Sequence, residues 1–134
     1  METSNGLEDF RKRSVVVICR AGSDRSKYIA EELSQRGYNA THGGTMEGHN
    51  YITKEDLSYA GSIIFASIHE KNQFDSDKSL KEYVKNNDIN IFVMNITESD
   101  KNRAHDSNKL QELRGTISEQ LDSIGFRGME KSQS

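Results

Sequence analysis

The sequence of 134 residues contains no proline and no tryptophan, and it has a single cysteine. One cysteine excludes an intramolecular disulfide and a zinc site built from several thiolates. It suits a reducing compartment, in which a thiol survives as a thiol. We therefore expect a cytoplasmic protein whose cysteine is either a buried filler of the core or a reactive group.

Long hydrophobic runs and an excess of one charge are also missing. No stretch approaches the roughly 20 apolar residues that a membrane-spanning helix needs, and the first residues lack the order of a signal peptide. The 18 basic and 21 acidic residues are interleaved and leave a net charge of −3. This balance provides neither the basic face that binds nucleic acid nor a polybasic membrane anchor. We expect neither partner, and we expect a monomer.

The four histidines lie in separate segments and show no metal-ligand spacing. We therefore expect no metal ion and no other cofactor.

Hydrophobic residues make up only 33% of the chain, and most of them are concentrated in short runs. Four runs rich in β-branched or aromatic residues predict strands, at residues 15–19, 38–42, 62–66 and 89–94. Three of these runs lack polar alternation, which is typical of parallel strands covered on both faces. Helical spacing and capping signals predict helices at residues 26–36, 53–57, 79–86 and 107–123.

This alternation of strands and helices predicts an α/β domain with a four-stranded parallel sheet and helices on both faces. Ligands of such doubly wound domains bind beyond the carboxyl ends of the strands. We expect residues 14–125 to form the domain, with a flexible N-terminal segment at residues 1–13 and a flexible tail at residues 126–134.

The most informative segment is VVVICRAGSDRS, at residues 15–26. Its apolar run ends at Cys19, passes through small residues and closes with Arg25 and Ser26 at the start of an amphipathic helix. The backbone N–H groups of such a turn and the helix N-terminus bind anions and stabilise a thiolate. A guanidinium can hold two phosphate oxygens in a planar fork.

The segment therefore predicts a phosphate site in which Cys19 is the nucleophile, Arg25 clamps the phosphate and the Ser26 hydroxyl supports the sulfur. The predicted substrate-binding residues are Arg20, Ala21, Gly22, Ser23, Asp24 and Ser26.

The C-x5-R-S pattern of residues 19–26 resembles the loop of the low-molecular-weight protein tyrosine phosphatases, which follows the first strand of that family. GYNATHGGT, at residues 37–45, is similar to the family's second strand and turn. ITKEDLSYAGSIIF, at residues 52–65, is similar to the segment leading into its third strand. The resemblance covers roughly residues 14–125, and a short bacterial branch of predicted phosphatases is the most similar group.

The resemblance implies a flavodoxin-like topology with strand order 2-1-3-4. It also implies a hydrolase that cleaves phosphate monoesters, protein phosphotyrosine included, through a phosphocysteine intermediate. The family's general acid is an aspartate in the loop after the last strand. Asp100 is the preferred candidate here, Glu98 is the alternative, and a third interpretation is that neither of them serves.

Other functions stay open. The chain could be a non-catalytic phosphate-binding module with a degenerate phosphatase site. A sugar-transport phosphocarrier also holds a phosphocysteine after its first strand, but it has no need of an arginine such as Arg25. Arsenate reduction usually requires a second cysteine, which this chain lacks. The substrate is either a phosphorylated protein or a small phosphomonoester.

Overall fold

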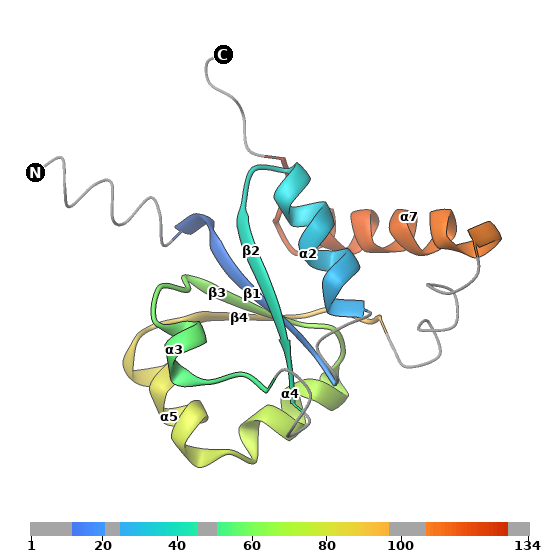
Figure 1. Cartoon of the computed structure of the whole chain (residues 1–134). Helices are drawn as coiled ribbons and strands as arrows, with labels where there is room; N and C mark the ends of the chain where they lie inside the picture. Colours follow the sequence, from blue (N-terminus) through green and yellow to red (C-terminus); the bar gives the residue numbers. More distant parts are fainter. Residues whose placement is uncertain (1–11, 21–24, 46–50, 97–106, 129–134) are drawn as a thin grey trace, which may run out of the picture.

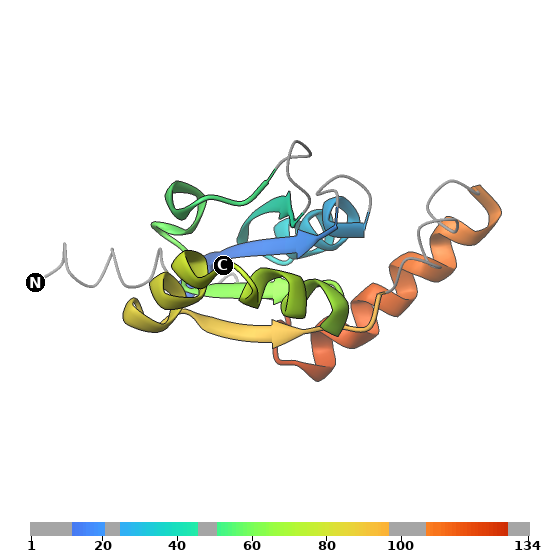
Figure 2. The ribbon, with the colours of Figure 1, turned by 90° about the horizontal axis from the view of Figure 1, so that it is seen from below.

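The computed structural model describes residues 12–20, 25–45, 51–96 and 107–128. Four strands form one sheet: β1 at Ser14–Cys19, β2 at Asn39–Gly44, β3 at Ser62–Phe65 and β4 at Asn90–Val93. Their order is β2-β1-β3-β4, and every neighbouring pair is parallel. The arrows of β1 (blue) and β4 (yellow) accordingly point the same way in Figure 2. The predicted fold class and strand order are confirmed.

Helices cover both faces of this sheet (Figure 1). On one face lie α2 at Arg25–Gln35 and α7 at Ser107–Ser123, and on the other lie α3 at Lys54–Leu57, α4 at Ile68–Asp75 and α5 at Lys78–Asn86. The first layer packs through a core that includes Ile29, Leu33 and Ile117. The second packs through a core that includes Leu57, Phe74 and Val84.

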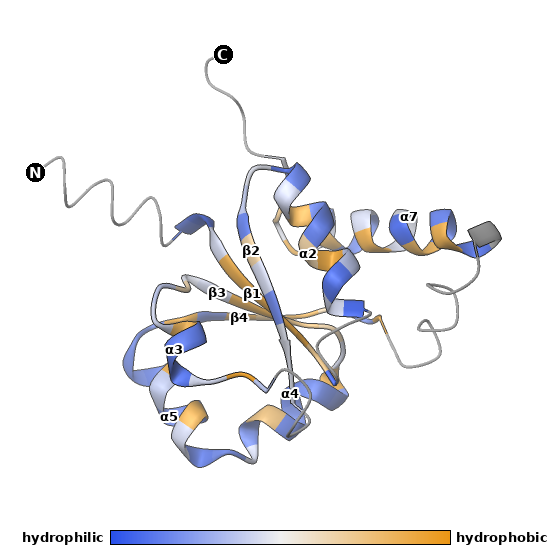
Figure 3. Ribbon diagram, in the orientation of Figure 1, coloured by the Kyte–Doolittle hydropathy of each residue, from blue (hydrophilic) through white to orange (hydrophobic). Residues whose placement is uncertain are grey.

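Strand β1 contributes to both cores, because successive side chains of a strand point to opposite faces. Val15 and Val17 belong to the core under α2 and α7, whereas Val16 and Ile18 belong to the core under the other three helices. All six residues of β1 are buried. Figure 3 shows the hydrophobic residues gathered along the sheet and on the inner sides of the helices.

Local signals in the sequence explain two of the helix boundaries. Helix α3 begins after a capping box, in which the Thr53 hydroxyl accepts from the Asp56 N–H and the Asp56 carboxylate accepts from the Thr53 N–H. Helix α2 is followed by Gly37, whose φ of 98° suits a glycine. No helix composed of described residues has both the length and the apolar character needed to cross a membrane.

Helix α4 was not predicted from the sequence. Its buried residues are Glu70 and Phe74, and its first residue, Ile68, is 58% exposed. Such a helix lacks the apolar stripe on which recognition by periodicity depends.

Arg36, just after α2, connects this helix to α7. Its guanidinium donates to the carboxylates of Glu32 and Asp122 at 2.9 and 2.8 Å, and also to the hydroxyl of Ser118 and the carbonyl of Phe126. Burial alone would lower the pKa of Arg36, but these carboxylates raise it above the ordinary value.

Phe126 is itself buried against other aromatic rings. The packed chain thus extends one residue past the expected domain boundary at residue 125.

We predict that Leu33→Ala lowers the free energy of unfolding by about 2–5 kcal/mol, because Leu33 is fully buried between α2 and the sheet. Urea denaturation of the purified protein measures this change. Ile68→Ala is the control, since an exposed side chain at a helix start should change stability by less than about 0.5 kcal/mol. Equal losses for the two variants would contradict the packing described above.

Candidate functional site

Cys19 is the last residue of β1 and is buried. Its sulfur lies 3.2 Å from the hydroxyl oxygen of Ser26, the second residue of α2, which is also fully buried. As a thiol, Cys19 donates to this oxygen. As a thiolate, it would accept from the Ser26 hydroxyl. The structure thus brings together two of the residues that the sequence selected.

Arg25, the first residue of α2, is only 2% exposed. Its Nη1 donates to Oε1 of Glu70 at 3.2 Å and to the carbonyl of Ile96 at 2.8 Å, while its Nη2 donates to Oε2 of Glu70 at 3.3 Å. Glu70 is 0% exposed. The guanidinium and the carboxylate therefore form a buried, two-bonded ion pair.

The partners of Arg25 come from the carboxyl ends of two other strands. Glu70 follows β3, and Ile96 follows β4. The Ile96 N–H in turn donates to the carbonyl of Ala66, and the Ala66 N–H donates to the carbonyl of Ile18, which joins the three strand ends by backbone hydrogen bonds. The connection after β1 leads outward to β2, and the connection after β3 leads outward to β4 on the opposite side, so the gap between the ends of β1 and β3 is the switch point at which doubly wound domains bind ligands.

Thr45 closes the β2 side of the site. Its backbone N–H donates to the carbonyls of Cys19 and Arg20, at 3.0 and 2.9 Å. Its hydroxyl donates to the side-chain oxygen of Gln73 at 2.6 Å. These bonds attach the end of β1 to β2 and α4.

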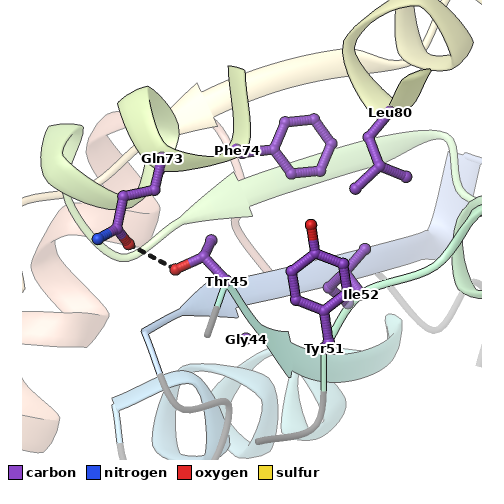
Figure 4. Close-up of a pocket in the computed structure, with 7 residues that line it drawn as sticks. All are labelled: Gly44, Thr45, Tyr51, Ile52, Gln73, Phe74 and Leu80. Atoms are coloured by element: carbon purple, nitrogen blue, oxygen red, sulfur yellow. Dashed lines mark hydrogen bonds between the residues drawn. The ribbon is translucent and has the colours of Figure 1, made fainter. Parts of the chain in front are cut away.

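Beside Thr45 lies a small hollow, shown in Figure 4. It is lined by Gly44, Thr45, Tyr51, Ile52, Gln73, Phe74 and Leu80. The positions that the centre of a water molecule can take in it fill about 10 Å³. This is room for roughly one water. The enclosed part of the hollow is therefore of a size that suits a water molecule.

The predicted site residues are only partly described. Cys19, Arg25 and Ser26 lie together as stated above, and Arg20 is exposed. Ala21, Gly22, Ser23 and Asp24 lie outside the described residues, as do both candidate acids, Asp100 and Glu98. Among the residues that are described, no three His, Cys, Asp or Glu side chains gather in a way that could hold a metal ion.

Sequence reasoning missed Glu70 and Ser67. The Ser-x-x-Glu spacing of residues 67–70, directly after a buried strand, was the available signal, and its simplest interpretation is a helix-capping box. In the structure the Glu70 carboxylate accepts from Arg25 instead, and the Ser67 hydroxyl donates to that carboxylate.

Comparison with known proteins gives no identification: no family model, no curated protein and no solved structure matches this chain.

One pH-dependent contact borders the hollow. The Tyr51 hydroxyl donates to the carboxylate of Asp77 at 2.9 Å, and this bond, followed by the Leu80 N–H, holds the pKa of Asp77 below its ordinary value. Because the pKa is lower in the folded chain than in the unfolded chain, ionised Asp77 stabilises the fold at neutral pH. That contribution is lost as the pH falls through the lowered pKa.

We predict that Tyr51→Phe moves the pKa of Asp77 upward, toward the ordinary value for an aspartate, because the variant removes the largest cause of the shift. The carboxyl carbon resonance of Asp77, followed by NMR against pH, measures this. Tyr59→Phe serves as the matched control, since Tyr59 is not among the causes of the shift. An unchanged titration midpoint in Tyr51→Phe would refute the assignment.

Proposed function

We propose that this chain is a cysteine-dependent phosphatase that hydrolyses phosphate monoesters. The observation that carries the proposal is the contact of the Cys19 sulfur with the Ser26 hydroxyl beside a buried Arg25, at the switch point of a parallel sheet. A cysteine that only filled the core would need neither a hydroxyl partner nor a buried arginine next to it in the fold.

In the proposed first step, the Cys19 thiolate attacks phosphorus, so that an S–P bond forms while the P–O ester bond breaks. Asp100 or Glu98 donates a proton to the departing oxygen. In the second step, water attacks phosphorus, the S–P bond breaks, and inorganic phosphate and the thiolate are released while the carboxylate recovers a proton from the water. The Ser26 hydroxyl stabilises the thiolate as a nucleophile and as a leaving group.

Arg25 stabilises the charge on the transferring phosphoryl group in both steps. Its Nη1 and Nη2 atoms donate to the Glu70 carboxylate, and Nη1 also donates to the Ile96 carbonyl. We expect the edge of the guanidinium formed by Nε and Nη2 to turn to two phosphate oxygens when the substrate binds.

We predict that Cys19→Ser lowers kcat/KM for p-nitrophenyl phosphate on the order of 10⁴-fold or more, because the variant removes the nucleophile. Steady-state assays measure this, and acid quench with ³²P-labelled substrate detects the phosphocysteine in the wild-type protein. Turnover in Cys19→Ser at the wild-type rate would remove Cys19 from the mechanism. Phosphate binding by calorimetry without any phosphoenzyme would instead support a non-catalytic phosphate-binding module.

For Arg25 the informative variant is Arg25→Lys. The structure argues against Arg25→Ala, since an alanine would leave the Glu70 carboxylate buried without its counter-charge, at a cost of about 3–5 kcal/mol. Lysine keeps a positive charge near Glu70 but lacks the fork, so we predict a loss of about 10²–10³-fold in kcat. The control is Arg114→Lys, which alters a guanidinium on α7 that lies 3.6 Å from Glu31. Equal activities of the two variants would count against a phosphate-binding role for Arg25.

A further inference from the structure

We propose that Glu70 is a positioning residue for the reaction, because it holds the guanidinium of Arg25 in the orientation that the transferring phosphoryl group requires. Ser67 in turn holds Glu70. This inference rests on the proposed function, and it assigns a role to two residues that the phosphatase resemblance does not include.

The first argument is that Ser67 and Glu70 do not form the helix-capping box that their spacing predicts. Ser67 is the N-cap of α4, yet its side chain makes no capping hydrogen bond. Its hydroxyl donates to Oε1 of Glu70, at 2.5 Å. Glu70 is the third residue of α4, from which a capping-box carboxylate would accept from the N–H of the N-cap residue. Here that carboxylate accepts from Arg25 instead.

The contrast with α3 makes this diversion clear. Thr53 and Asp56 have the same spacing at the start of α3, and they form the complete capping box. Both positions are on the surface, whereas Ser67 and Glu70 are buried. The start of α4 therefore lacks the side-chain cap that α3 has, and its Glu70 carboxylate binds an arginine instead.

The second argument concerns charge. A fully buried carboxylate is costly, and a buried ion pair often adds no stability compared with apolar residues of the same size. The Arg25–Glu70 pair is therefore poorly explained by stability alone. Fixing the orientation of a planar fork is a role that apolar residues cannot supply.

The third argument concerns geometry. Glu70 accepts from both Nη atoms, and the Ile96 carbonyl accepts from Nη1 as well. These acceptors come from two segments of the chain and restrict both the position and the rotation of the guanidinium. Ordering the side chain before substrate arrives removes that entropy cost from the reaction. Because Glu70 also balances the charge of Arg25, its benefit lies in orientation rather than in simple attraction of anions.

The test is Glu70→Gln, which keeps the shape of the side chain but replaces one acceptor oxygen with a donor that faces Arg25. We expect kcat for p-nitrophenyl phosphate to fall about 10- to 100-fold, with KM changed less than about 3-fold. Inhibition by vanadate, which mimics the five-coordinate transition state, should weaken in parallel with kcat/KM. Inhibition by inorganic phosphate should change little.

Two further variants keep the test informative if Glu70→Gln does not fold. Glu70→Asp retains the carboxylate and should recover part of the lost kcat. Ser67→Ala removes one hydrogen bond to the carboxylate and should lower kcat by about 3- to 10-fold. The matched control is Glu82→Gln, on the exposed side of α5, which should leave kcat and KM unchanged.

Three outcomes would overturn the inference. If Glu70→Gln lowers the melting temperature but leaves kcat per folded molecule unchanged, Glu70 is only structural. If the variant binds phosphate more tightly with an unchanged kcat, Glu70 competes with the substrate instead of positioning Arg25. If the wild-type protein neither hydrolyses p-nitrophenyl phosphate nor binds phosphate, the proposed function fails and this inference fails with it.

Discussion

The position of β1 between β2 and β3 is the constraint on which the rest of the structure depends. Every residue of β1 is buried, and its alternating side chains belong to two separate cores. A strand held on both faces and along both edges has little freedom to slide, because a shift of one residue would exchange the side chains between the cores. The place where β1 ends is therefore well defined. Cys19 lies at that point, and helix α2, which carries Arg25 and Ser26, packs against the same strand.

The ion pair between Arg25 and Glu70 adds an electrostatic constraint to this packing. Arg25 belongs to α2, on one face of the sheet, while Glu70 belongs to α4, which packs in the core of the other face. The pair reaches from one layer to the other where the carboxyl ends of the strands leave room for polar side chains. The same guanidinium also donates to the Ile96 carbonyl after β4. A single side chain thus joins elements that are far apart in the sequence.

Much of the fold could be predicted because its signals are local. The β-branched runs located all four strands, and the capping box and the glycine after α2 located helix boundaries. Strand β2 extends to Gly44, two residues further than predicted, because Gly43 and Gly44 pair with Ile18 and Cys19 although glycines usually mark a turn. The site could be predicted only where its residues are neighbours in sequence. Glu70 lies 45 residues from Arg25, and a lone carboxylate on a weakly amphipathic helix carries no sign of its partner.

The Arg25–Glu70 pair also has a consequence for how this sequence can change over generations. Replacing either member alone leaves a buried charge without its partner, at a cost of about 3–5 kcal/mol, a large part of the 5–15 kcal/mol that typically separates folded from unfolded chains. Exchange of both members for apolar residues avoids this cost but removes the guanidinium. The two positions are therefore expected to change together. A single replacement passes through a destabilised protein, and a double replacement by apolar residues restores stability but loses the arginine.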